Sequence, residues 1–307
     1  MAKSKINRRE FIGRSAALGA VALIGGKAWG RPAAEPIGLA VVSGSDPDAM
    51  AVKAVEILGG MKAFVPKGAK VALLPNVQSK HPGTFTKPGI LRAVIRMCKE
   101  AGAAQIDCLS LLTQAHWDGA GLTQVVQEEG IGLKLIPRDE AGFKAVPIPG
   151  GQALTEARIA KELDAYDLYI NLPITKDHAG NKFTGTLKNH MGLNGNNRVF
   201  HKTNWKTDPA DIDFLETCIV DLNTVLKPHL NIVDAVEIIT SNGPMGPGDL
   251  AKPGQVIAGV DRVAVDAYCA KAVLGLVPAD IACIRKAHER GLGQIDLAKV
   301  RIVKASI

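Results

Sequence analysis

The chain has 307 residues, of which 47% are hydrophobic and 22% charged, a balance typical of globular proteins. Its formal net charge is +7, but residues 1–34 carry seven Lys and Arg against one Glu, a net of 7 − 1 = +6, which leaves about +1 (7 − 6) for the rest. A nearly neutral body gives no support for nucleic-acid binding, and no apolar stretch beyond the N-terminus is long enough to predict a membrane span.

The N-terminus has the pattern of a twin-arginine signal peptide. Arg8 and Arg9 precede Phe11 and Ile12, and a weakly hydrophobic run covers residues 15–26. We predict a signal over residues 1–34, cleaved between about residues 30 and 34, and a single α/β domain over residues 35–307. The twin-arginine translocation machinery is then a partner, and the expected location is the periplasm or another exported compartment. The alternative is a helical N-terminus that stays attached.

Strands and helices alternate in the first half of the chain. Hydrophobic runs predict strands over residues 37–43, 70–74, 105–109 and 132–136. Helical spacing predicts helices over residues 46–58, 90–101 and 122–129, with Asp46 as a cap and Pro88 in a first turn. This alternation predicts an α/β fold with a mostly parallel mixed sheet and helices on both faces.

The second half continues the same pattern less regularly. We predict helices over residues 155–163, 210–226, 262–274 and 279–290, and strands over residues 167–172, 230–240, 255–260 and 300–304. A Gly- and Pro-rich segment over residues 241–254 is interpreted as a loop, with residues 243–248 as a plain turn.

Three polar loops follow predicted strands, over residues 76–86, 110–121 and 171–197. Ligands of parallel sheets bind beyond the carboxyl ends of the strands, so these loops are expected to converge on one edge. The longest loop concentrates lysine, histidine, asparagine and glycine, and loops of this length are uncommon unless they are functional.

The candidate catalytic residues are Lys176, His178 and Lys188. The two lysines supply positive charge for a carboxylate or phosphate, and the histidine is a candidate general base or metal ligand. The candidate binding residues supply amide or hydroxyl groups, backbone access or a carboxylate: Asn76, Asn189, Thr184, Gly185 and Asp261. Residues 188–189 are also expected in a short helix whose free N–H groups face an anion. The alternatives are a solvated loop for residues 171–197 and a strand-end cap for Asp261.

A metal or cofactor is not identified by the sequence. Five loop histidines are candidates for a shared metal site: His81, His116, His178, His190 and His201. No short-spaced set of His and Cys requires such a site. The five cysteines form no C-x-x-C pair and no iron–sulfur motif, and we interpret them as buried small hydrophobic residues.

Several motifs in the chain resemble the domain of unknown function 362 family. The matching segments occur in the expected order: LLPN at residues 73–76, TKP at 86–88, EAGA at 100–103, NLP at 171–173, Lys176, His178, TG at 184–185, LKN at 187–189, Gly192, AGVD at 258–261, AVDA at 264–267 and GLG at 291–293. Many members are similarly exported by a twin-arginine signal. Some carry an attached iron–sulfur ferredoxin module, whose cysteines this chain lacks.

Two classes of function remain open at this stage. The first is an exported enzyme that binds a small anionic substrate or cofactor through Lys176 and Lys188 and moves a proton with His178. The second is a non-catalytic binding protein or redox-accessory protein that holds a cofactor, metal or anion for a partner.

Overall fold

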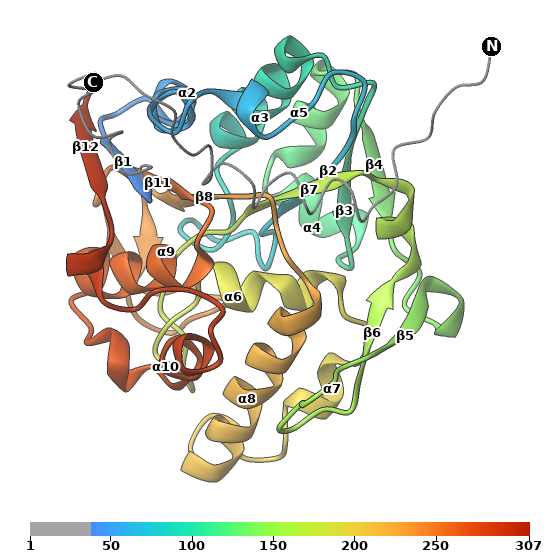
Figure 1. Cartoon of the computed structure of the whole chain (residues 1–307), viewed down its shortest axis with the longest axis vertical. Helices are drawn as coiled ribbons and strands as arrows, with labels where there is room; N and C mark the ends of the chain where they lie inside the picture. The colour runs from blue at the N-terminus through green and yellow to red at the C-terminus, as the bar shows by residue number, and fades with distance from the viewer. Residues whose placement is uncertain (1–37) are drawn as a thin grey trace, which may run out of the picture. The chain divides into compact units, whose positions relative to one another are not determined.

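The computed structural model describes residues 38–307, so the predicted signal peptide lies outside the described residues. An eight-stranded sheet crosses the molecule (Figure 1). Its strands lie side by side in the order β12 (Ile302–Ser306), β1 (Leu39–Ser43), β11 (Gln255–Gly259), β8 (Leu230–Ala235), β7 (Leu168–Leu172), β2 (Lys70–Pro75), β3 (Gln105–Ser110) and β4 (Gly132–Leu135).

The sheet is parallel except at β11, which pairs antiparallel with both β1 and β8. A parallel pair needs a long crossover, usually a helix, between its strands. Between β8 and β11 the chain forms only the short strands β9 (Ile238–Ile239) and β10 (Leu250–Ala251), so it returns antiparallel. The predicted mostly parallel mixed sheet is confirmed.

Helices cover both faces of the sheet, as predicted (Figure 1). Along β2, Val71 and Leu73 pack against one set of helices, whereas Ala72 and Leu74 enter the other core, because successive side chains of a strand point to opposite faces. The first face is covered by α2 (Pro47–Ile57), α3 (Pro88–Ala101) and α5 (Leu122–Glu128), and the second by α6 (Thr186–Asn189), α8 (Pro209–Val225), α9 (Arg262–Tyr268) and α10 (Ala282–Glu289).

Local signals place several helix ends correctly. The carboxylate of Asp46 accepts hydrogen bonds from the backbone N–H groups of Asp48 and Ala49, which caps α2. Gly102 ends α3 in the left-handed conformation, with φ of 88°. The predicted loop over residues 110–121 instead contains the short helix α4 (Gln114–Gly119), which buries Trp117 completely.

The helix predicted over residues 155–163 is wrong. Residues 156–160 form strand β6 (Glu156–Ala160), which pairs antiparallel with β5 (Phe143–Pro147), and only residues 161–165 turn as a 3₁₀ helix. Ala157 and Ile159 are buried at a spacing of two, which is the period of a strand. The partner strand decides the conformation here, so local propensity did not reveal it.

The ends of two other predicted helices also differ. After α9 the chain widens into a π-helical turn over Cys269–Val273, and before α10 it makes a 3₁₀ turn over Pro278–Asp280. Another short helix, α7 (Asn197–Phe200), lies in the segment after α6. Within residues 38–307, no helix combines the length and apolarity that a membrane crossing requires.

All five cysteines are buried and unpaired, which confirms their interpretation as small hydrophobic residues. Burial raises the pKa of the Cys98 thiol to about 12. A thiol held protonated in this way is a poor nucleophile.

We predict that Asp221→Ala destabilises the protein by about 3–5 kcal/mol. The fully buried carboxylate of Asp221 accepts hydrogen bonds from the backbone N–H groups of residues 152–154 in the β5–β6 connection and forms an ion pair with Arg290. Its removal leaves a half-buried guanidinium and three N–H groups without that acceptor. Urea denaturation measures the change.

Asp213→Ala on the same helix is the matched control, since the carboxylate of Asp213 is half exposed and forms an ion pair with Lys286. We expect a loss of at most about 1 kcal/mol from it. Equal losses in the two variants would contradict the role assigned to Asp221.

Candidate functional site

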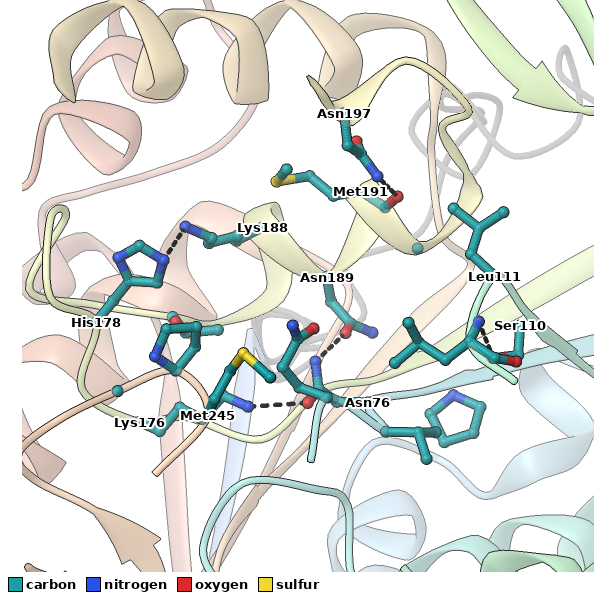
Figure 2. Close-up of a pocket in the computed structure, with 18 of the residues that line it drawn as sticks. Asn76, Ser110, Leu111, Lys176, His178, Lys188, Asn189, Met191, Asn197 and Met245 are labelled. Atoms are coloured by element: carbon teal, nitrogen blue, oxygen red, sulfur yellow. Dashed lines mark hydrogen bonds between the residues drawn. The ribbon is translucent and has the colours of Figure 1, made fainter. Parts of the chain in front are cut away.

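The loops that follow β2, β3 and β7 converge at the carboxyl edge of the sheet, as predicted. They surround a pocket of about 450 Å³, which is shown in Figure 2. This volume is in the range of small-molecule sites. The lining comprises residues 74–78 after β2, residues 109–112 after β3, residues 242–246 and part of the segment after β7. The segment after β7 contributes eleven residues: Lys176, His178, Thr184, Lys188, Asn189, Met191, Gly192, Asn197, His201, Trp205 and Lys206.

Lys176 lines this pocket although its residue has no exposed surface. Its Nζ donates hydrogen bonds to the side-chain oxygen of Asn76 (3.0 Å) and to the backbone oxygen of Thr84 (2.6 Å). Backbone hydrogen bonds between Lys176 and Thr184 hold the segment in place. Burial, and secondarily the charge of Lys188, lowers the pKa of Lys176 to about 7. An ammonium has three N–H groups. Two of those on Lys176 donate to oxygen atoms of the protein, and the third remains to bind an anion.

The asparagine side chains form a connected set behind Lys176. Asn76 Nδ2 donates to Asn189 Oδ1 at 2.9 Å (Figure 2). Asn189 Nδ2 donates to the backbone oxygen of Leu74 and to Asn171 Oδ1. Both N–H groups of Asn189 are therefore used inside the protein. Asn76 keeps one side-chain N–H for a ligand, whereas Asn189 orients Asn76.

His178 and Lys188 form the second polar pair of the pocket. The Nζ of Lys188 lies 2.6 Å from His178 Nε2 (Figure 2) and 3.3 Å from Asn181 Oδ1. Burial, and secondarily the neighbouring basic groups with Lys188 first among them, lowers the pKa of His178 to about 2, so the ring is neutral at physiological pH. Burial also lowers the pKa of Lys188, to about 8.

Asn181 and Glu216 support this pair, and the sequence did not reveal them. Asn181 Nδ2 donates to Glu216 Oε1 (2.5 Å), and the other carboxylate oxygen accepts from the backbone N–H of Cys283 (2.8 Å). Glu216 is buried on α8, and burial raises the pKa of its carboxyl. Its position inside an otherwise apolar helix stretch was the available signal, since a buried glutamate needs a partner.

The short helix α6 carries Lys188 and Asn189, and its start does not bind an external anion. The backbone N–H groups of Thr186 (2.6 Å) and Leu187 (3.0 Å) donate to the fully buried carboxylate of Asp266 on α9. An internal carboxylate thus occupies the position at which we expected a ligand. Burial raises the pKa of Asp266 to about 7.

Gly185 and Asp261 are not brought to the pocket. A Cβ on Gly185 would lie 2.3 Å from Asp266 Oδ1, so this glycine permits the close approach of α6 to Asp266. The carboxylate of Asp261 caps α9 through the N–H groups of Val263 and Ala264 and accepts from Gln294 N. These geometries give both residues a structural role.

Thr184 does line the pocket, and its buried hydroxyl has no hydrogen-bond partner among the described residues. Buried hydroxyl groups are rarely left unpaired, so this one still needs a partner.

The loop histidines do not gather into one cluster. His201 lines the pocket next to Trp205, with ring centroids 4.8 Å apart, and Trp205 also contacts His178. His190 is buried away from it against Asn223 and Tyr169, and neither His81 nor His116 lines it. Within residues 38–307 no three His, Cys, Asp or Glu side chains are arranged to hold a metal ion.

The segment over residues 242–246 is part of the site and more than a plain turn. Its Gly243 N–H donates to Asp177 Oδ2 (2.8 Å), and its carbonyl accepts from Ala179 N, so it packs beside the segment that carries His178. A Cβ on Gly243 would lie 1.9 Å from the backbone oxygen of Asp177. The Gly and Pro content of this segment, which follows a strand, was the local sequence feature that could have indicated its place in the site.

The fold and the pocket together define a class: an α/β protein with a lysine-lined pocket at the carboxyl edge of its sheet. The family model described as "Domain of unknown function (DUF362)" matches residues 71–271, which is more than half of the chain. The chain belongs to the DUF362 family.

Three known proteins show the range of similarity. The thylakoid-associated protein sll1697 of Synechocystis sp. (strain ATCC 27184 / PCC 6803 / Kazusa) is 29% identical over 249 residues, which cover 78% of this chain and 73% of that protein. The lactate racemase apoprotein from Thermoanaerobacterium thermosaccharolyticum matches with a TM-score of 0.48 and 13% identity. A Thermotoga maritima protein solved by the Northeast Structural Genomics Consortium matches with a TM-score of 0.44 and 12% identity. The matches cover 85% and 80% of this chain, but only 58% and 59% of those two structures.

We predict that Asp266→Ala impairs the pocket, whereas Asp261→Ala does not. Both carboxylates accept from two backbone N–H groups at a helix start, but only Asp266 holds the helix that carries Lys188. Unsatisfied N–H groups cost about 1–3 kcal/mol each in Asp266→Ala, and loss of the cap costs about 1 kcal/mol in Asp261→Ala. Thermal denaturation measures the stability of each variant. Calorimetric titration with glycolate, a small carboxylate, measures the affinity of the pocket for an anion. Weakened glycolate binding in Asp261→Ala alone would contradict the assignment.

Proposed function

We propose that this protein is an enzyme that binds a small anionic molecule in the pocket and transfers a proton with the His178–Lys188 pair. The observation that carries this proposal is the charge of the lining. Three lysines line the pocket, and none of the lining residues that the structure describes is Asp or Glu. A cationic, partly enclosed site of this volume favours a carboxylate or phosphate.

Specific groups support anion binding on one side of the pocket. Lys176 has one N–H beyond its two oxygen acceptors, Asn76 has one free side-chain N–H, and the hydroxyl of Thr184 has no partner in the described chain. Together they supply three donors on neighbouring segments, which suits the oxygens of a carboxylate or phosphate.

The His178–Lys188 pair supports a catalytic role. Both groups face the pocket, and burial brings the pKa of Lys188 to about 8, close to physiological pH. A group with a pKa near the operating pH is suited to general acid–base catalysis. The alternative, a non-catalytic binding protein, shares the anion site but does not require this pair.

Lys176→Met tests the anion site. We expect glycolate affinity to fall at least tenfold, because the buried cation is lost. Lys182→Met is the matched control, since Lys182 is an exposed lysine of the same loop. The affinity of this variant for glycolate should equal that of the wild type. Isothermal titration calorimetry at pH 6 gives both values. Unchanged binding in Lys176→Met would place the anion elsewhere.

The affinity of the wild type for glycolate should also fall as the pH rises. The ammonium of Lys176 binds the anion below its pKa of about 7 and loses its charge as the pH rises through that value. Glycolate remains ionised throughout, because a carboxyl of this kind has a pKa near 4. Titrations at pH 6 and pH 8.5 should differ by roughly tenfold or more. An affinity that stays constant across this interval would contradict a role for Lys176.

We also propose that the protein is exported by the twin-arginine route. Arg8 and Arg9 before a short apolar run support this, and the name of the Synechocystis relative places that protein at the thylakoid. Replacing both arginines with lysine should leave the full-length precursor in the cytoplasm of a bacterial host, whereas the wild type is exported and shortened. Cell fractionation with immunoblotting tests this, and equal export of both forms would contradict it.

A further inference from the structure

The hydrogen bonds around His178 determine which ring nitrogen carries its proton. Nδ1 accepts from the backbone N–H groups of Gly180 (3.2 Å) and Asn181 (3.3 Å). A nitrogen that accepts hydrogen bonds carries no proton, and a neutral imidazole has one proton in all. The proton of His178 is therefore on Nε2, the nitrogen that faces Lys188.

This tautomer determines the state of Lys188. Nε2 lies 2.6 Å from Lys188 Nζ, and an N–H at Nε2 must donate to a lone pair. An ammonium has no lone pair, whereas a neutral amine has one. The contact is therefore satisfied when Lys188 is a neutral amine that accepts from His178.

Asn181 agrees with this assignment. Its Nδ2 donates to Glu216, so its Oδ1 is the atom that faces Lys188, at 3.3 Å. The amine thus accepts one hydrogen bond from His178 and donates one to Asn181, and its second N–H points to neither. A neutral amine has this set of one lone pair and two N–H groups.

Burial, and not the neighbouring charge, disfavours an ammonium at Lys188. Glu216 is separated from it by Asn181 and makes no direct hydrogen bond with it. Burial outweighs the opposite effect of the Glu216 carboxylate, whose charge favours an ammonium. The ionisable groups that face or influence Lys188 are His178, Lys176, His201, Glu216 and Cys283. The lowered pKa of Lys188, about 8, has the same direction as the hydrogen-bond argument.

The two lysines therefore have different roles. Lys176 donates to two oxygens, which suits a cation, whereas Lys188 accepts from a ring nitrogen, which suits a nucleophile. A buried amine beside another cationic group is a recognised form of activated lysine. Apolar side chains, among them Met191 and Leu111, also line the pocket (Figure 2).

We propose that Lys188 forms an imine with a small anionic carbonyl compound, an aldehyde acid or a 2-oxo acid, whose carboxylate is held by Lys176. This inference rests on the anion site of the proposed function and adds the class of substrate. The lone pair of Lys188 leaves His178 and attacks the carbonyl carbon, and one of the two N–H protons of the amine moves to the carbonyl oxygen to give a carbinolamine. That hydroxyl then leaves as water with the remaining N–H proton, so that amine and carbonyl yield imine and water and no oxidant or reductant is consumed.

Reductive trapping with glyoxylate tests this proposal. Glyoxylate is the smallest aldehyde acid, and sodium cyanoborohydride converts its imine into a stable carboxymethyl-lysine. The wild-type protein is treated at pH 7, and peptide mass spectrometry follows the modification of each lysine with time. We expect Lys188 to react at least tenfold faster than the exposed Lys182, because Nζ of Lys188 accepts from His178 as a neutral amine and burial lowers its pKa.

Two variants and one control ligand complete the experiment. Lys188→Arg and Lys188→Met should remove the fast phase and leave the slow labelling of Lys182 unchanged. Glycolate, which has the carboxylate but no carbonyl, should compete with the fast phase without forming an adduct. Labelling of Lys188 at the rate of Lys182 in the wild type overturns the proposal, and this readout does not depend on the variants folding.

The outcomes separate this inference from the proposed function. If glycolate binds but Lys188 shows no fast phase, the imine is excluded and the anion site stands. If Lys188 reacts fast but glycolate neither binds nor competes, the nucleophile stands and the role of Lys176 as the anion site fails.

Discussion

The burial of the Lys176 ammonium is the constraint on which the carboxyl edge of the sheet depends. An unpaired buried charge is costly, so the protein must supply oxygen acceptors wherever such a group is held. Here they come from Asn76 and from the backbone of Thr84, two points of the loop after β2, while the lysine itself follows β7. One side chain therefore ties together two loops that are about a hundred residues apart in the chain. The asparagine set behind it, in which Asn189 orients Asn76, is a consequence of the same requirement.

Carboxylates inside the protein serve backbone N–H groups in preference to ligands. Asp266 holds the start of α6, Asp261 caps α9, and Asp221 binds the connection between β5 and β6. Each satisfies donors that a helix start or an irregular segment leaves free. Because these acids are used internally, the pocket remains lined by lysine, histidine and amide groups, and its charge is available to an anion.

The His178–Lys188 pair shows how hydrogen-bond direction can assign a chemical role. Two backbone N–H groups determine the tautomer of His178, and the tautomer determines what Lys188 can be. Asn181 connects Lys188 to Glu216 on α8 through two hydrogen bonds. Membership of the DUF362 family assigns no reaction, so the chemistry has to be argued from these contacts.

Much of the architecture was determined by local sequence. Hydrophobic periodicity and the residues at element ends placed most strands and helices, and the position of polar loops after strands placed the pocket and Lys176, His178 and Lys188 within it. These features are local, because they depend on side-chain spacing, on caps such as Asp46 and on the geometry of parallel strands.

Only the tertiary structure decided the rest. The strand β6 exists because β5 pairs with it, and Asp261 and Gly185 are directed into structural contacts by segments far along the chain. Glu216 and the segment over residues 242–246 reach the site only when α8 and the β8–β11 connection pack against the central loop. Which nitrogen of His178 is protonated, and whether a lysine is a cation or an amine, depend on burial and on the partners that folding places within about 3 Å. A linear sequence specifies the residues that meet, but the physical state of each group is set by its surroundings after they have met.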